Sequence, residues 1–146
     1  MDNILDRITI TDLKKEDYHT FKKIHLQLKN TKDFSNDRFI EMLDKLDKTD
    51  SKYFCLRLKN CDEIIGCGKF FYDFKLGNNK GFIDDVIIDK NYRGKKLGTF
   101  LVNKIIEHVK TKDCYTVYLV AENKNKIFYN NLHFRNDKLI FNYDIF

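Results

Sequence analysis

The chain has 146 residues, of which 42% are hydrophobic and 34% are charged. At about 150 residues per domain, this length predicts one domain spanning residues 1–146. The 13 Phe and 8 Tyr supply enough large apolar surface for a folded core, which argues against a disordered chain. No apolar run approaches the roughly 20 residues that span a bilayer, and the first ten residues lack the apolar region of a secretory signal peptide. We therefore expect a cytoplasmic protein without a membrane span.

Basic residues outnumber acidic ones, 27 to 22, which gives a formal charge of +5. Only 5 of them are arginines, the residue favoured for reading bases and clamping phosphates, so the composition does not predict a nucleic-acid partner. The four cysteines (Cys55, Cys61, Cys67 and Cys114) form no C-x-x-C pair, and no histidine stands nearby at the spacing of zinc ligands. We expect reduced thiols and no metal.

Hydrophobic periodicity predicts the elements of the first half of the chain. Apolar residues alternate with polar ones near the N-terminus, recur at helical spacing in the next two segments, and alternate again after residue 52. A polar turn between the last two apolar runs predicts a hairpin. The predicted elements are a strand at 7–11, a helix at 15–29, a helix capped by Ser35, and strands at 53–58 and 64–74.

The second half begins with the strongest turn signal in the chain, Gly77-Asn78-Asn79-Lys80-Gly81. After it, strand-like and helix-like periods alternate, which with the first half describes a mixed sheet with helices packed on it, an α/β (α+β) class. The predicted elements are strands at 82–88, 115–120 and 139–145, an amphipathic helix at 99–110, and a short helix at 123–131.

The segment from Arg93 to Gly98 carries the clearest chemical signal. It joins a predicted strand to a predicted helix, whose N-terminus offers unpaired N–H groups and the positive end of the helix dipole. Gly94 and Gly98 let backbone amides approach an anion closely, and Arg93, Lys95 and Lys96 add positive charge. The pattern predicts a phosphate site, although it is not a Walker A loop; the alternative is that the segment is only a turn.

Arg93 to Gly98 resembles the pyrophosphate-binding Q/R-x-x-G-x-G/A signature of the GCN5-related N-acetyltransferases, with Lys96 in place of the usual middle glycine. Within that superfamily the chain is similar to the eukaryotic glucosamine 6-phosphate N-acetyltransferases, in which I-[ED]-D-V, R-G-K-x-L-G, C-Y and N-x-x-F-Y occur in this order. The strong part of the resemblance covers residues 81–134. The corresponding residues are Ile83-Asp84-Asp85-Val86, Arg93 to Gly98, Cys114-Tyr115 and Asn125 to Tyr129.

The resemblance implies a mixed, mostly antiparallel sheet flanked by about four helices, with a V-shaped opening between the strands at 82–88 and 115–120. Acetyl-CoA would lie in this opening, its pantetheine on the strand backbone and its pyrophosphate on the loop. The residues implied to bind it are Val86, Ile87, Ile88, Arg93, Gly94, Lys95, Lys96, Leu97, Gly98, Asn125, Phe128 and Tyr129.

Asp84 and Asp85 interrupt an otherwise apolar strand, where carboxylates are costly to bury. Neighbouring strand residues face opposite ways unless a bulge intervenes, so only one of the two would normally face a substrate. The resemblance implies that both orient the amino sugar and that either helps to deprotonate its ammonium group; a salt bridge is the alternative. It also implies that Tyr129 donates a hydrogen bond or a proton to the CoA thiolate, whereas the alternative is an aromatic residue that only packs.

The resemblance further implies a set of substrate contacts and a homodimer. Its sugar phosphate needs cations, but the family's C-terminal arginine is missing from residues 141–146, so this contact is either absent or supplied by Lys138. The apolar tail at 139–146 would pair with a second chain rather than remain an exposed edge; the alternative is that it closes its own sheet. The implied substrate-binding residues are Lys29, Lys75, Asp84, Asp85, Val120, Ala121 and Lys138.

The predicted reaction is a direct transfer of acetyl from acetyl-CoA to the amine of D-glucosamine 6-phosphate, since no Cys–His pair suggests an acyl-enzyme. Two alternatives remain open at this point. One is acetylation of another amine, such as a polyamine or a protein amine. The other is a module that binds acetyl-CoA without catalysis.

Overall fold

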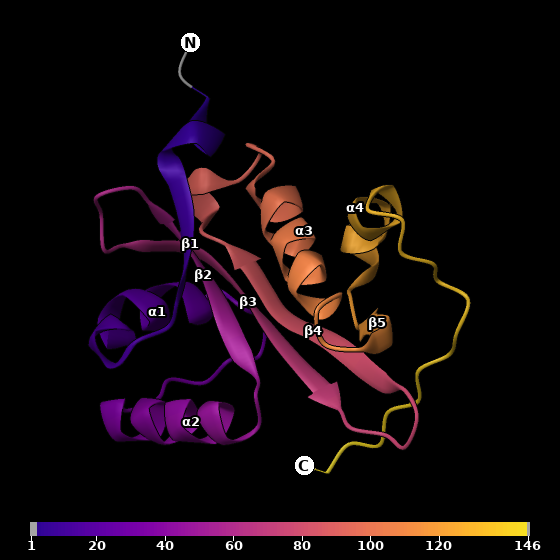
Figure 1. Cartoon of the computed structure of the whole chain (residues 1–146). Coiled ribbons are helices and arrows are strands. Elements are labelled where there is room, and N and C mark those ends of the chain that lie inside the picture. The colour runs from indigo at the N-terminus through magenta and orange to yellow at the C-terminus, as the bar shows by residue number, and fades with distance from the viewer. Residues whose placement is uncertain (1–2, 146) are drawn as a thin grey trace.

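The computed structural model describes residues 3–145, and its strands form one sheet (Figure 1). Neighbouring strands are antiparallel from the first to the fourth, and the last two run parallel. The predicted mixed, mostly antiparallel sheet is therefore confirmed. Within the described residues the strands, in their order across the sheet, are β1 (Ile8–Asp12), β2 (Lys52–Leu58), β3 (Ile64–Asp73), β4 (Asn79–Ile88) and β5 (Cys114–Leu119).

The α-helices of residues 3–145 are α1 (Tyr18–His25), α2 (Asn36–Lys48), α3 (Leu97–Val109) and α4 (Lys126–Asn131). On one face of the sheet, Phe21 of α1 and Phe39 of α2 pack with Tyr53 of β2. On the other face, Leu101 of α3 packs with Ile83 of β4, and α4 lies beside α3 (Figure 1). The alternation of side chains along each strand separates these two cores. Among the described residues, no helix has the length and apolarity needed to cross a bilayer.

α1 is shorter at both ends than the helix predicted at 15–29. Lys15–Asp17 form a 3-10 turn, and the Asp17 carboxylate is buried against Arg57, with Oδ2 2.6 Å from Nη2. Beyond the C-terminal end of α1, Asn30 adopts a left-handed φ of +63°. A regular helix does not accommodate that conformation, so the chain turns towards α2.

The strand predicted at 139–145 is not formed. Residues 132–145 contain neither helix nor strand, and the segment runs outside α4 and β5 in Figure 1. Phe141 and Tyr143 are 87% and 89% exposed. A strand requires a partner for its backbone groups, and the tail pairs with none of the described strands, so the alternative that it closes its own sheet is wrong. Phe146 lies outside the described residues.

β4 and β5 separate part-way along β4. Their last paired residues are Ile83 and Leu119, whereas β4 continues to Ile88. No other strand of the described chain lies along that edge of residues 84–88, so backbone N–H and C=O groups there remain available to a ligand. The predicted opening between these two strands is present.

Candidate active site

The unpaired part of β4 contributes backbone rather than side chains to the opening. Val86 and Ile88 pack beside α3, while Ile87 packs on the side of α1 and α2. Arg93 Nε donates to the Ile88 carbonyl oxygen at 3.0 Å, which ties the following loop to the end of the strand. The three predicted positions therefore belong to the core through their side chains, and only their main chain faces the opening.

The loop after β4 presents the N-terminus of α3 to solvent. Gly94 has a φ of +78°, with no atom within 4 Å of the place where a Cβ would lie. Lys96 caps α3 in the left-handed conformation, with φ +63° and ψ +18°, and Leu97 behind it is buried. The first N–H groups of a helix have no partner within it, and Lys95 is exposed beside them. This arrangement suits the pyrophosphate of a nucleotide cofactor.

Gly98 and Phe128 bring α3 and α4 together. A Cβ on Gly98 would lie 3.2 Å from Phe128 Cζ, so the missing side chain leaves room for the ring. The ring centroids of Phe128 and Tyr129 are 4.9 Å apart, and Phe134 lies 5.6 Å from Tyr129 on its other side. Phe128 therefore packs beside the loop, and this contact positions Tyr129.

A β-bulge places both acidic side chains on one face of the sheet. Cys67 pairs with Ile87 and Lys69 with Asp84, so two residues of β4, Asp85 and Val86, stand opposite one residue of β3. Asp85 has a left-handed φ of +53°. Such a bulge interrupts the alternation of a strand, and it decides the question of orientation that the sequence left open.

The face shared by the two carboxylates is the one that α1 covers further along the sheet. Ile83 packs under α3, so its neighbour Asp84 points away from α3 by strand alternation. Asp85 accepts a hydrogen bond from Tyr53, which belongs to the core beneath α1. The Asp84 Oδ1 accepts from the Asp85 N–H at 2.9 Å, which fixes the pair relative to one another.

A cleft of about 600 Å³ lies on this face between β3, β4, β5 and residues 133–140. It brings together three predicted substrate residues, Asp84, Val120 and Lys138. Ala121 and Tyr129 line a smaller pocket of about 140 Å³, which shares Leu119 and several tail residues with the cleft.

The remaining predicted residues lie at the edge of this region or away from it. Lys29 Nζ is 3.6 Å from a carboxylate oxygen of Glu122, just after β5. Asn125 directly precedes α4. Lys75 pairs with Asp73 in the β3–β4 turn at 3.4 Å and does not line the cleft. The structure thus brings Lys29 towards the site and leaves Lys75 at the far end of the hairpin.

Sequence reasoning missed several residues that line or adjoin the cleft. Phe71 stacks on Phe82 with ring centroids 5.1 Å apart, and Phe82 contacts Tyr118 at 5.8 Å, so three strands contribute one aromatic row. Arg135 also lines the cleft, and Lys69 stands opposite Asp84 in the sheet. Strand alternation would have placed the aromatic side chains on one face, but no local pattern identifies the two cations among so many others.

Residues 11–134 match the sequence profile of the acetyltransferase (GNAT) family. The chain belongs to this family. It is 28% identical over 134 residues to glucosamine 6-phosphate N-acetyltransferase 1 of Dictyostelium discoideum, covering 88% of this chain and 85% of that protein. It is also 40% identical over 67 residues to N-alpha-acetyltransferase 30 of Xenopus laevis, covering 44% of this chain and 24% of that protein.

The crystal structure of glucosamine-6-phosphate N-acetyltransferase from Arabidopsis thaliana has the same fold. Its TM-score is 0.86 at 24% identity, and the match covers 94% of this chain and 98% of that one. The expected fold is thereby confirmed. As a GNAT protein, the chain is an acetyl-CoA-dependent N-acetyltransferase. Within residues 3–145 of this acetyltransferase, no three His, Cys, Asp or Glu side chains are grouped so as to hold a metal ion.

Tyr129 of the acetyltransferase is held in its protonated form. Burial of the phenol, together with the nearby Asp84 carboxylate, raises the pKa of Tyr129 above its ordinary value of 10.0. The hydroxyl therefore keeps its proton at neutral pH. A group that must donate a proton or a hydrogen bond to developing thiolate charge requires this state.

Replacing Lys96 by glycine is expected to stabilise the acetyltransferase. A non-glycine residue in the left-handed region costs about 1 kcal/mol, which glycine avoids. For a chain of this length, that gain corresponds to a rise of about 2–4 °C in melting temperature. The matched control is Lys95→Gly, since Lys95 is not among the residues with positive φ. A melting temperature for Lys96→Gly no higher than that of Lys95→Gly would contradict this account of the loop.

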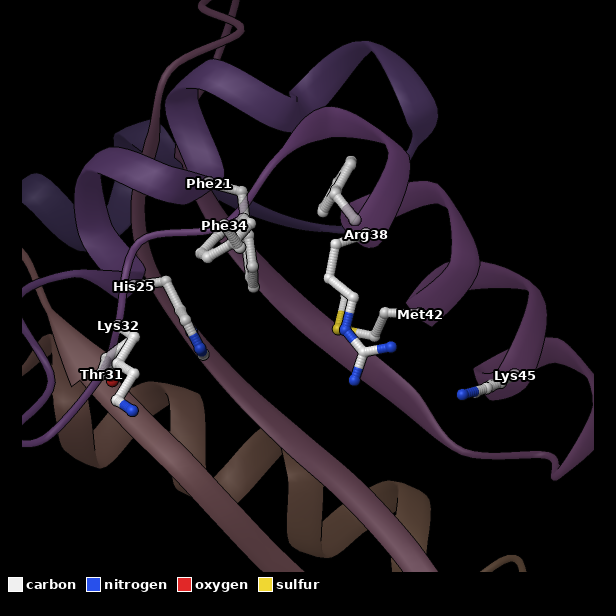
Figure 2. A pocket seen from close by; sticks show the side chains of 9 residues that line it. Phe21, His25, Thr31, Lys32, Phe34, Arg38, Met42 and Lys45 are labelled. Carbon is white, nitrogen blue, oxygen red and sulfur yellow. The ribbon is translucent and has the colours of Figure 1, made fainter.

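A separate pocket of about 290 Å³ lies between α1 and α2 (Figure 2). Phe21, Phe34 and Met42 line it, and Arg38 extends along its edge. The His25 ring stacks on Phe21 with centroids 4.9 Å apart. Burial lowers the pKa of His25, so the ring is neutral near pH 7. None of the residues predicted to bind acetyl-CoA or substrate lines this pocket.

Proposed function

We propose that this acetyltransferase transfers the acetyl group of acetyl-CoA to the 2-amino group of D-glucosamine 6-phosphate. The products would be N-acetyl-D-glucosamine 6-phosphate, an intermediate of UDP-N-acetylglucosamine biosynthesis, and CoA. The observation that carries the proposal is the pair Asp84 and Asp85 on one face, where β4 and β5 separate. Similarity to the Dictyostelium enzyme over most of both chains supports the substrate.

The acidic pair and Tyr129 supply the proton transfers of this reaction. One carboxylate takes a proton from the substrate ammonium group, and the nitrogen lone pair bonds to the acetyl carbonyl carbon. As the carbon–sulfur bond breaks, sulfur takes the Tyr129 proton. The second nitrogen proton restores Tyr129 through solvent, and the carboxylate releases its own, so one proton is set free for each amide formed. This direct route needs both substrates bound together.

The cations of the cleft suit a phosphorylated substrate. Arg135 and Lys138 both line it, and Lys29 pairs with Glu122, which lines the smaller pocket beside it. Arginine and lysine are the side chains that bind phosphate. In this proposal Arg135 and Lys138 take the part of the arginine that is missing from residues 141–146.

A second chain would complete the site in this proposal. The exposed tail includes Leu139 and Ile140, which also line the cleft. Pairing of two tails in a homodimer would bury Phe141 and Tyr143 and leave no long hydrophobic segment exposed to solvent. Two-fold symmetry is the usual form of such assemblies.

A protein amine is the second candidate substrate. The segment similarity to the Xenopus N-alpha-acetyltransferase favours it, although it spans less than half of this chain and a quarter of that protein. The catalytically silent alternative predicts acetyl-CoA binding without turnover.

A panel of amines tests the substrate. Acetyl-CoA is mixed with the protein and a thiol reagent, and release of CoA is followed with glucosamine 6-phosphate, glucosamine, spermidine and a short peptide with a free N-terminus. A charge-assisted hydrogen bond contributes about 1.5–3 kcal/mol, so the phosphate should raise kcat/KM at least about tenfold over glucosamine. Equal values for the two sugars would contradict the phosphate contact. Preference for the peptide would favour the second candidate, and no release with any amine would favour the silent module.

A further inference from the structure

Tyr53 occupies an unusual position for a buried tyrosine, because its hydroxyl group reaches one of the two carboxylates of the site. Its side chain lies in the core beneath α1, and the residue is 3% exposed. The hydroxyl donates to Asp85 Oδ2 at 2.7 Å. Burial, reinforced by the Asp85 carboxylate, raises the pKa of Tyr53 far above its ordinary value. The phenol is therefore a permanent donor to this oxygen.

The Tyr53 ring is held on several sides. Phe21 and His25 of α1 meet it edge to face, with centroid distances of 5.1 and 6.2 Å. Lys69 Nζ lies 5.9 Å from the ring centroid on the strand next to β4. A ring clamped in this way has one orientation, so its hydroxyl has a fixed position relative to α1 and the sheet.

Asp85 needs such a support more than a regular strand residue would. It lies in the bulge with left-handed backbone, where strand alternation no longer directs its side chain. Its carbonyl oxygen accepts from the Cys67 thiol at 3.8 Å, which anchors the backbone. Asp85 is partly exposed directly beside Asp84, which lines the cleft. Among the described residues no hydrogen bond is found at Asp85 Oδ1, so one oxygen is fixed by Tyr53 and the other has no protein partner.

We propose that Tyr53 is a positioning residue that holds Asp85 as the base of the acetyl transfer. The inference rests on the proposed function, in which one carboxylate of the pair is the base. The Tyr53 hydroxyl fixes Oδ2, so that Oδ1 takes the ammonium proton without first having to reorient. Misplacement of a reacting group by about 1 Å can cost about 10²-fold in rate.

The test compares Tyr53→Phe with Tyr72→Phe. The two substitutions remove the same chemistry, since Tyr72 donates to Asp50 Oδ2 at 2.6 Å away from the acidic pair. With the amine that the panel identifies, Tyr53→Phe should lower kcat about 10- to 100-fold and leave the KM for acetyl-CoA within about twofold. Tyr72→Phe should keep wild-type kcat. Equal kcat for both variants would overturn the proposal.

A double-mutant cycle separates positioning from a general effect on folding. If Tyr53 acts through Asp85, adding Tyr53→Phe to the Asp85→Asn variant should lower kcat no further. The same fold loss in both backgrounds would overturn the proposal. Asp85→Glu gives an independent measurement even if Tyr53→Phe folds poorly, because it keeps the carboxylate but displaces it by one methylene. At least about tenfold loss of kcat is expected, and full turnover with glutamate would show that position is not critical.

These measurements separate the positioning role of Tyr53 from the identity of the substrate and from the base role of Asp85. An unexpected amine in the panel changes the substrate but leaves the cycle readable with that amine. Full activity of Asp85→Asn would remove the base role assigned to Asp85, and with it the reason for Tyr53 to act. If Asp85→Asn lowers kcat and Tyr53→Phe does not, the base role of Asp85 stands and only the positioning role of Tyr53 is refuted.

Discussion

Replacing Tyr129 by phenylalanine is expected to lower kcat about 10²- to 10⁴-fold, which is the usual contribution of a positioned general acid. The ring still packs between Phe128 and Phe134, so α4 keeps its place beside α3. The lost hydroxyl acts on the charge that develops on sulfur in the transition state, and binding of acetyl-CoA should hardly change. Initial rates and a direct binding titration measure the two effects separately.

The control for this substitution is Tyr115→Phe, on an exposed side chain of β5. It should retain wild-type rates.

The raised pKa of Tyr129 also bears on how the rate depends on pH, because the protonated form persists to higher pH than in a free tyrosine. Loss of the Tyr129 proton should therefore cause no decline in rate below about pH 10. Wild-type turnover in Tyr129→Phe would show that the residue only packs.

Removal of residues 139–146 is expected to abolish both activity and dimerisation. In the proposed dimer the tail supplies the pairing segment, and Leu139 and Ile140 line the cleft that holds substrate. Light scattering at micromolar concentration should give the mass of two chains for the wild type and of one for the truncated protein. A mass near 17.6 kDa for the fully active wild type would contradict the dimer.

A pair of point variants separates loss of the dimer from loss of the cleft wall. Phe141→Asp and Asn142→Asp place the same charge at neighbouring positions that do not line the cleft. The first puts a carboxylate on the apolar series of the tail and should give inactive monomers, because an unpaired charge is costly to bury. The second alters a residue that is already polar and should remain dimeric and active. Active monomers of Phe141→Asp would show that the dimer is not needed.

The sequence alone predicted most of the elements, because helix and strand periods are local. The helix predicted at 99–110 is α3 at Leu97–Val109, and Ser35 caps α2 by accepting the Arg38 N–H at 3.2 Å, as expected. The loop signature and the family were also recognisable, because a strand-to-helix turn for phosphate requires particular residues at fixed spacing. The strand predicted at 139–145 failed, because apolar alternation shows that a segment is able to pair but not that a partner is present.

Only the tertiary structure decided how the chemical groups meet. The bulge that turns Asp84 and Asp85 to one face depends on the register between β3 and β4, and no single strand contains that information. Tyr53 reaches Asp85 across 32 positions of sequence, and Arg135 joins the cleft because the chain after α4 passes along β5. The residue types that carry the chemistry are readable from local pattern, whereas their distances are set by strand pairing and helix packing between segments far apart in the chain.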